Sequence, residues 1–231
     1  VSLKNDPAVN AGQFNSILGE KSWHSSDVTP EDFNDAFSFF GVQFGNYVGN
    51  EQRQQDLNEA YDALTDLAGV LGIQTKALSL NGELGLAFGA RGTGGKRAPS
   101  AHYEPAQVVI NLTKARGAGS LAHEWFHGVD NYFSRMAGAK SQYLTETPGA
   151  KGDVRPEMVE AFKRVMQTIR TTSLPARSRR LDETRSKPYW GTKLEMAARS
   201  FESYIVAKLQ DQNASNDYLA NIVSEDYWKA A

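Results

Sequence analysis

A chain of 231 residues is long enough for one large domain, or two small ones, with a proper hydrophobic core. The absence of cysteine excludes disulfides, thiolate zinc sites and a cysteine nucleophile. A net charge of −2 argues against a surface that binds nucleic acid as a whole, and no apolar run approaches the ~20 residues of a membrane span.

The N-terminal third is predicted to hold a polar arm and two helices. Residues 1–27 are polar and lack a periodic pattern, which favours an extended arm. Thr29-Pro30-Glu31-Asp32 offers an N-cap, a proline at the first position and acids that suit the helix dipole. Apolar side chains then recur at helical spacing: Phe33, Ala36, Phe37 and Phe40. A second helix is predicted from Glu51 to Leu71, ended by Gly72.

Two strands are predicted next, over Leu84 to Ala90 and Gln107 to Leu112, because both are rich in apolar residues. Between them, residues 91–97 form a basic, glycine-rich loop. It lacks the Gly-Lys-Ser/Thr ending of a phosphate cradle and a helix after it, so we expect a mobile loop beside a cleft. We place His102 in the loop before the second strand, within reach of that cleft.

The most informative motif follows the second strand. His123-Glu124-Trp125-Phe126-His127 reads H-E-x-x-H within an apolar-periodic segment that starts near Ser120. Two histidines four apart on a helix share one face and can hold a zinc ion, and the glutamate between them can act as general base. The competing interpretation is a helix that carries these residues by chance, packed through its apolar side chains Leu121, Ala122, Trp125, Phe126 and Val129.

A catalytic zinc usually takes three protein ligands and one water, so a third ligand is needed. The metzincin position holds Phe133 instead of histidine. The segment Thr192 to Val206 is strongly helical in composition and places Glu195 and Glu202 on one face. Glu195 is our first choice for the ligand and Glu202 the second, while the competing interpretation makes both solvated carboxylates.

Asp130 lies three residues after His127, on the side of the helix that faces the metal. It is a candidate ligand, or a residue that accepts a ring N–H from a ligand histidine and so fixes its tautomer. A plain surface aspartate is the alternative.

The C-terminal third is predicted to be helical. After a loop at residues 138–153, a helix is expected over Pro156 to Arg170, burying Met158, Ala161, Phe162, Val165 and Ile169. A basic insertion near 170–190 follows, in which residues 170–187 carry six cations; it is either a solvated segment or a contact for nucleic acid or an acidic partner. A last helix is expected over Asp217 to Trp228. The order of elements predicts an α+β fold, with residues 28–231 as one domain.

Several of these stretches resemble a known group of proteins. The Leu-Ala-His-Glu-x-x-His helix and the later Glu195, Ala198 and Phe201 are similar to the gluzincin-type zinc metallopeptidases, including the ImmA/IrrE-like peptidases. The stretches 44–47, 78–92 and 101–105 resemble the zincin-like domain of large polyvalent proteins of phages and plasmids. The resemblance covers roughly residues 28–210. It implies a zincin-like fold, in which a small sheet with an edge strand packs on the H-E-x-x-H helix. A first residue Val1 without methionine is what we expect of a fragment of a longer chain or of a processed product.

These observations together predict a zinc-dependent peptidase. Zinc held by His123, His127 and Glu195 lowers the pKa of its water, and Glu124 takes the proton and passes it to the leaving amine. The candidate donors to the developing oxyanion are Tyr204, Tyr132, His102 and Arg199. We expect Tyr204 to share the helix face of Glu195, and the strand at residues 107–112 to pair with the substrate backbone.

The substrate expected for this activity is a protein or peptide in the cytoplasm of a bacterium, and no membrane is involved. The competing function is a non-catalytic module that binds protein or DNA on a zincin scaffold, with the basic segment 170–187 as the contact. Glu124 favours the enzyme, since a binding module has no need of a base there.

Overall fold

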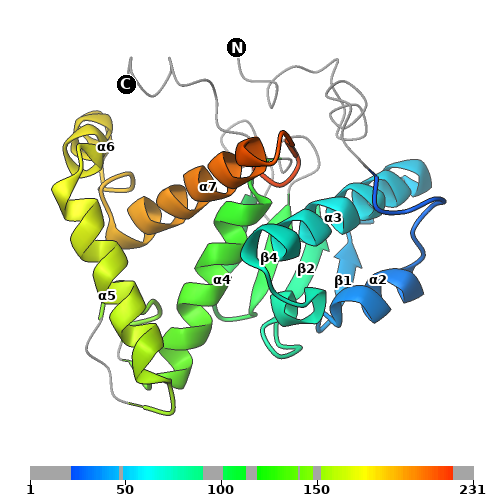
Figure 1. The fold of residues 1–231 in the computed structure, drawn as a ribbon, viewed down its shortest axis with the longest axis horizontal. Helices are drawn as coiled ribbons and strands as arrows, with labels where there is room; N and C mark the ends of the chain where they lie inside the picture. Colours follow the sequence, from blue (N-terminus) through cyan, green and yellow to red (C-terminus); the bar gives the residue numbers. More distant parts are fainter. Residues whose placement is uncertain are drawn as a thin grey trace.

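The computed structural model describes residues 22–46, 49–90, 101–112, 119–139, 141–147 and 152–220. Within these ranges the chain forms six α-helices, a short 3-10 helix and a four-stranded sheet (Figure 1). The predicted α+β class and the small size of the sheet are therefore confirmed. Among the described helices, none combines the length and the apolar character needed to cross a bilayer.

Helix α2 (Pro30–Phe37) begins where its sequence predicts. The hydroxyl of Thr29 accepts from the backbone of Asp32, whose side chain in turn accepts from the backbone of Thr29. The helix ends earlier than its apolar spacing suggests, because Ser38 adopts a left-handed conformation with φ of 55°. Phe40 is consequently 81% exposed, and Phe39 is buried in its place.

Helix α3 (Asn50–Leu71) matches its prediction, and Gly72 ends it at a φ of 64° that suits glycine. Part of the expected N-terminal arm is fixed to this helix. The backbone N–H of Trp23 donates to Asp62 over 2.8 Å, and its indole N–H donates to Asp66 over 2.7 Å. The first 21 residues lie outside the described part, as does the glycine-rich segment 91–97.

The sheet contains β1 (Val42–Phe44), β2 (Gly85–Phe88), β3 (Ala101–Glu104) and β4 (Val109–Leu112), in the order β1-β2-β4-β3. Strands β1, β2 and β4 run parallel to one another, and β3 pairs with β4 in the antiparallel direction.

This order corrects two expectations. The predicted strand at residues 107–112 is β4, which hydrogen-bonds to strands on both sides, so its backbone has no free edge for a substrate. Strand β3 lies at one edge of the sheet, the other edge being β1, and it carries His102, which the sequence predicts in a loop. Tyr103 of β3 donates from its hydroxyl to Asn131 of α4 over 3.0 Å, so the edge strand does pack on the H-E-x-x-H helix.

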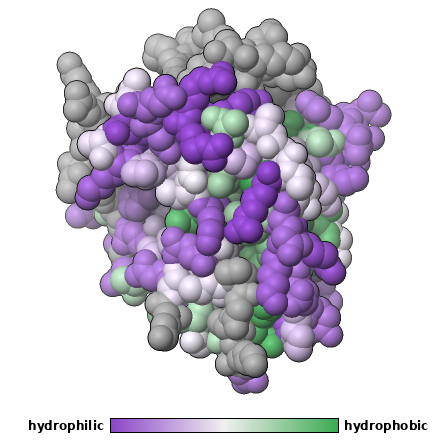
Figure 2. Space-filling model, turned by 90° about the vertical axis from the view of Figure 1, so that its left-hand side faces the viewer, coloured by the Kyte–Doolittle hydropathy of each residue, from purple (hydrophilic) through white to green (hydrophobic). Residues whose placement is uncertain are grey.

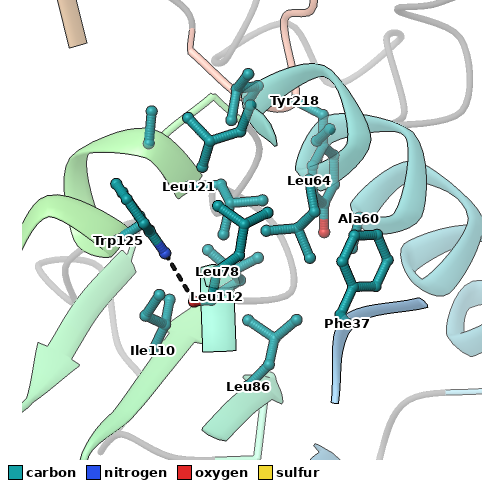
Figure 3. Close-up of a cluster of buried hydrophobic side chains, with 14 of the residues drawn as sticks. Phe37, Ala60, Leu64, Leu78, Leu86, Ile110, Leu112, Leu121, Trp125 and Tyr218 are labelled. Carbon is teal, nitrogen blue, oxygen red and sulfur yellow. Dashed lines mark hydrogen bonds between the residues drawn. The ribbon is translucent and has the colours of Figure 1, made fainter. Parts of the chain in front are cut away.

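The main core lies where the sheet, α3 and α4 meet, as Figure 3 shows. The indole N–H of Trp125 donates to the carbonyl of Leu78 over 2.9 Å, which ties α4 (Leu121–Met136) to the 3-10 helix η2 (Thr75–Ser79) (Figure 3). Tyr218 closes the core from the C-terminal side. It lies in a turn at residues 217–219, not in the predicted helix, whose remainder from residue 221 lies outside the described residues.

Three further helices follow α4: α5 (Pro156–Thr171), α6 (Leu174–Asp182) and α7 (Lys193–Asp211). Helix α5 packs on α7 through two residues of each, Met166, Ile169, Met196 and Ala197. Val165 is 40% exposed and Met166 is buried, so the buried face is turned from the predicted one. Much of the basic segment forms α6, and Figure 2 shows a largely hydrophilic surface on the side of the molecule that carries α5 and α6.

Candidate metal centre

Three buried side chains from two helices point their polar atoms at one another. His123 Nε2 and His127 Nε2 of α4 lie 3.1 Å apart. Glu195 of α7 places Oε2 3.5 Å from His123 Nε2 and Oε1 3.4 Å from His127 Nε2. The three residues are 5–9% exposed, so these atoms have little access to water.

These separations fit a zinc ion. Zinc is bound at ~2.0–2.1 Å by histidine and at similar distances by carboxylates, so two ligand atoms of a tetrahedral site lie about 3.3 Å apart. The two ring nitrogens are 3.1 Å apart, and each lies 3.4 or 3.5 Å from a different oxygen of the Glu195 carboxylate, so all three separations are close to that value. Two imidazole nitrogens and one carboxylate also form a donor set of catalytic zinc, with a fourth position left for water.

Local helix geometry brings the two histidines together, and packing between α4 and α7 adds the glutamate. His123 and His127 are four residues apart on α4 and so share one face. The ring of Phe201 lies between Trp125 and Phe126, with centroids 5.7 and 5.1 Å away. Ala197 and Ala198 on α7 are buried, and their small side chains let the helices approach closely.

Glu202, the second-choice ligand, lies on the other side of the His123 ring. Its carboxylate is 3.6 Å from His123 Nδ1, whereas Nε2 of the same ring faces Glu195. It therefore stands outside the group of three and suits the role of the carboxylate that orients a ligand histidine and sets its tautomer.

The electrostatics of the group follow from two opposing effects. Burial alone would lower the pKa of His123, but hydrogen bonds to Glu195 and Glu202 and the nearby carboxylate charges raise it to about 10. Burial alone would raise the pKa of Glu195, but hydrogen bonds to both histidines hold it well below its usual range. In the absence of a metal, a proton on His123 would supply the positive charge of this group. Zinc binding would then release that proton.

Glu124, the candidate base, lies between the two histidines in sequence and is 7% exposed. Burial raises its pKa, and the charges of His123 and His127 oppose the shift. A carboxylate whose proton affinity is raised by a dry environment is suited to accept a proton from water near neutral pH.

Asp130 does not occupy the position expected of it. Its Oδ1 accepts from the backbone N–H of Thr145 over 2.9 Å, and its Oδ2 accepts from the Thr145 hydroxyl over 2.6 Å. Among the described residues, His127 Nδ1 has no hydrogen-bond partner, so Asp130 does not receive that ring N–H. Asp130 is fully buried rather than on the surface, and it anchors the segment after α4 that carries Tyr143, whose ring centroid is 5.9 Å from that of His127.

The four proposed oxyanion donors fall in different places. Arg199 lies at the site, with Nη2 donating to Glu195 over 2.9 Å. His102 Nε2 lies 3.1 Å from Glu104 on β3, and its charge acts on Glu124. Tyr132 stacks edge-on with Phe133, and Arg135 lies over its ring.

The expectation for Tyr204 is wrong. Nine positions on a helix amount to about two and a half turns, which places Tyr204 opposite Glu195 on α7. Its side chain is accordingly 44% exposed beside Lys208. Seven positions amount to about two turns, which is why Glu202 does share the face of Glu195.

Two tyrosines that the sequence did not single out lie near the ligands. The ring centroid of Tyr189 lies 5.6 Å from the guanidinium carbon of Arg199, and burial, together with the charge of Glu195, raises the pKa of Tyr189. Burial also raises the pKa of Tyr143, with the charges of Asp130, Glu124 and Glu195 adding to the shift. Their positions depend on loops, so no periodicity signals them; only the aromatic pair Tyr189-Trp190 just before α7 marks the place.

Comparison with known proteins gives one partial match. The family model of large polyvalent protein-associated domain 1 matches residues 181–231. This match supports the polyvalent-protein context that the sequence resemblance implies, and it covers α7 with Glu195 and Glu202. No curated protein and no solved structure matches the chain significantly.

Proposed function

We propose that the chain is a zinc metallopeptidase module with a zincin-like fold, belonging to a mobile-element protein and acting in the bacterial cytoplasm. One observation carries the proposal: two histidines and a glutamate converge at tetrahedral ligand spacing beside a buried glutamate. His123, His127 and Glu195 converge at 3.1–3.5 Å, and Glu124 is buried on the same helix as the histidines.

The residues divide the work of peptide hydrolysis. Bound zinc would supply a Lewis acid that polarises the carbonyl and acidifies water. Glu124 takes the proton of the attacking water and passes it to the leaving amine. Glu202 holds the ring of His123 through Nδ1. The phenols of Tyr143 and Tyr189 stand nearer to this group than Tyr204 and are our candidate donors to the oxyanion.

The substrate backbone would pair with β3, the edge strand beside α4. An extended peptide that adds a strand to a sheet edge gains main-chain hydrogen bonds that do not depend on its side chains. His102 and Glu104 alternate along β3 with the buried Ala101 and Tyr103, so the histidine is available to contact the substrate.

The Glu124→Gln variant tests the proposal. We expect it to keep stoichiometric zinc, because Glu124 is not a ligand, and to lose nearly all cleavage of a denatured casein and peptide-library mixture followed by mass spectrometry. Glu160→Gln, an exposed glutamate on α5, is the matched control and should cleave as wild type does. Unchanged cleavage by Glu124→Gln would overturn the role of the base.

A binding module is the second candidate, and one feature favours it. A groove of about 990 Å³ between α5, α6 and α7 is lined by apolar side chains together with Arg164 and Arg177. An acidic protein segment or nucleic acid would suit these cations. Cleavage by the wild type separates the two functions. A binding module would show none, and its Glu124→Gln variant would keep its affinity for a partner.

A further inference from the structure

Arg199 is a buried cation that is held by hydrogen bonds and by an aromatic ring. It is 6% exposed, and its Nη2 donates to Glu195 Oε2 over 2.9 Å. Its Nη1 donates to the carbonyl of Trp190 over 3.3 Å, and the guanidinium carbon lies 3.9 Å from the centroid of the Trp190 ring. The ring of Tyr189 lies on the same guanidinium, with its centroid 5.6 Å from the guanidinium carbon. The guanidinium is therefore fixed both in its plane and across its face.

The segment that holds Arg199 is itself closed by one carboxylate. Oδ1 of Asp182 accepts from the backbone N–H groups of Tyr189 and Trp190 over 3.0 and 2.9 Å, and Oδ2 accepts from Gly191 over 2.8 Å. A Cβ on Gly191 would lie 3.2 Å from that Oδ2, which explains the need for a small residue there. We call residues 182–191 the strap.

The strap and Arg199 act on the orientation of the Glu195 carboxylate. Arg199 donates to Oε2 of the glutamate, and Oε1 remains directed at His127 over 3.4 Å. A planar, rigid guanidinium loses less side-chain entropy for each hydrogen bond than a lysine does, and its stacking on Trp190 adds a cation–π contact.

Arg199 also has an opposing effect, because a cation near the site disfavours a second cation. That repulsion is reduced by the ion pair with Glu195, which neutralises the guanidinium. Loss of Arg199 would leave the Glu195 carboxylate free to rotate away from the two histidine nitrogens that it faces at 3.4 and 3.5 Å. The positioning effect is therefore the larger one.

We propose that Arg199 is a positioning residue that holds Glu195 ready for zinc, and that the strap holds Arg199. This inference rests on the proposed function for its metal. The segment matched by the polyvalent-protein family model begins at residue 181, next to Asp182, and contains the strap, Glu195 and Arg199 together. The third ligand and the device that orients it thus lie in one continuous piece of chain.

The test measures the zinc dissociation constant of the whole chain by competition with a chromogenic chelator. Arg199→Met should weaken zinc binding about 10- to 100-fold, the range for partners that orient metal ligands. Trp190→Ala should weaken it less, and Arg199→Lys should recover part of the loss. Arg135→Met is the matched control. Arg135 lies on the metal helix α4, and its substitution removes a surface ion pair with Glu83, so the variant should bind zinc as wild type does.

Two further readouts separate positioning from general loss of structure. The visible spectrum of the Co²⁺-loaded protein should change in Arg199→Met, because Glu195 is reoriented, and should not change in Arg135→Met. If Arg199→Met does not fold, the Trp190→Ala and Trp190→Phe pair decides, with a loss expected only for alanine. Wild-type zinc affinity in Arg199→Met, or an equal loss in Trp190→Phe and Trp190→Ala, would overturn the inference. Absence of tight zinc binding in the wild type would instead overturn the proposed function.

Discussion

The two halves of the candidate metal centre are built in different ways. On α4, His123, Glu124 and His127 fall within five consecutive positions, and the helix alone fixes their relative placement. Glu195 of α7 comes 68 positions after His127. It reaches the histidines only because the intervening chain, which forms α5 and α6, folds back and brings α7 onto α4. The α4 half therefore depends on local geometry, whereas the α7 half depends on tertiary packing and on the strap. Substitutions in the two halves should differ in what they disturb.

Removal of a ligand should have the largest effect and tests whether both halves hold the same ion. His127→Ala and Glu195→Ala should each lower zinc affinity by more than the roughly 100-fold that an orienting partner costs, because a bond to the metal is lost outright. Isothermal titration of metal-free protein measures the change. Full zinc occupancy in Glu195→Ala at equimolar metal would move the ligand to another carboxylate and break the comparison.

A smaller effect is expected where α7 supports α4. Glu202 faces His123 Nδ1 at 3.6 Å, so Glu202→Gln keeps the three ligands and removes the charge behind one of them. We expect zinc affinity to fall about 10-fold, the lower end of the range for such partners. The exposed Glu160 again provides a matched control as Glu160→Gln. A loss as large as that of Glu195→Ala would make Glu202 a ligand.

The contrast between local and tertiary geometry also explains what the sequence could predict. Helices with clear signals were found nearly to the residue, as with Gly72 after α3 and Pro30 at the start of α2. Strands β2 and β4 are equally short but mostly apolar, whereas Gln43 in β1 and His102 and Glu104 in β3 interrupt the apolar pattern, so β1 and β3 were missed.

At the site, the H-E-x-x-H spacing sufficed to place two histidines on one face, and the composition of α7 suggested Glu195. The partners of Asp130 and of Arg199 lie in loops whose course no periodic pattern reveals. Thr145 and Trp190 are examples, since each meets its partner only after the chain has turned back. Tyr204 is a different case. Its spacing of nine positions from Glu195 already places it on the opposite face of α7, whatever the tertiary packing.

The last expected effect is on the stability of the α4 half and its pH dependence, not on zinc affinity. Burial raises the pKa of Asp130 to about 6, against the hydrogen bonds from Thr145 that lower it. Between pH 3.8, the ordinary pKa of an aspartate, and about pH 6, the folded protein then binds more protons at this residue than the unfolded chain does. The free energy of unfolding that Asp130 contributes must therefore fall as pH rises through this window, by about 3 kcal/mol at most.

Asp130→Asn removes this titration. The asparagine keeps an oxygen that accepts from the Thr145 N–H, and it places an amide near the Thr145 hydroxyl. Urea unfolding of metal-free wild type and variant at pH 4, 5, 6 and 7 measures the difference, in which the titration of all other groups cancels. Relative to the variant, wild type should lose stability from pH 4 to pH 6 and change little above pH 7, because Asp130 is then ionised in both states. A gain for wild type over the same window would mean that the carboxylate is stabilised in its ionised form, and that Asp130 assists His127 rather than the loop at Thr145.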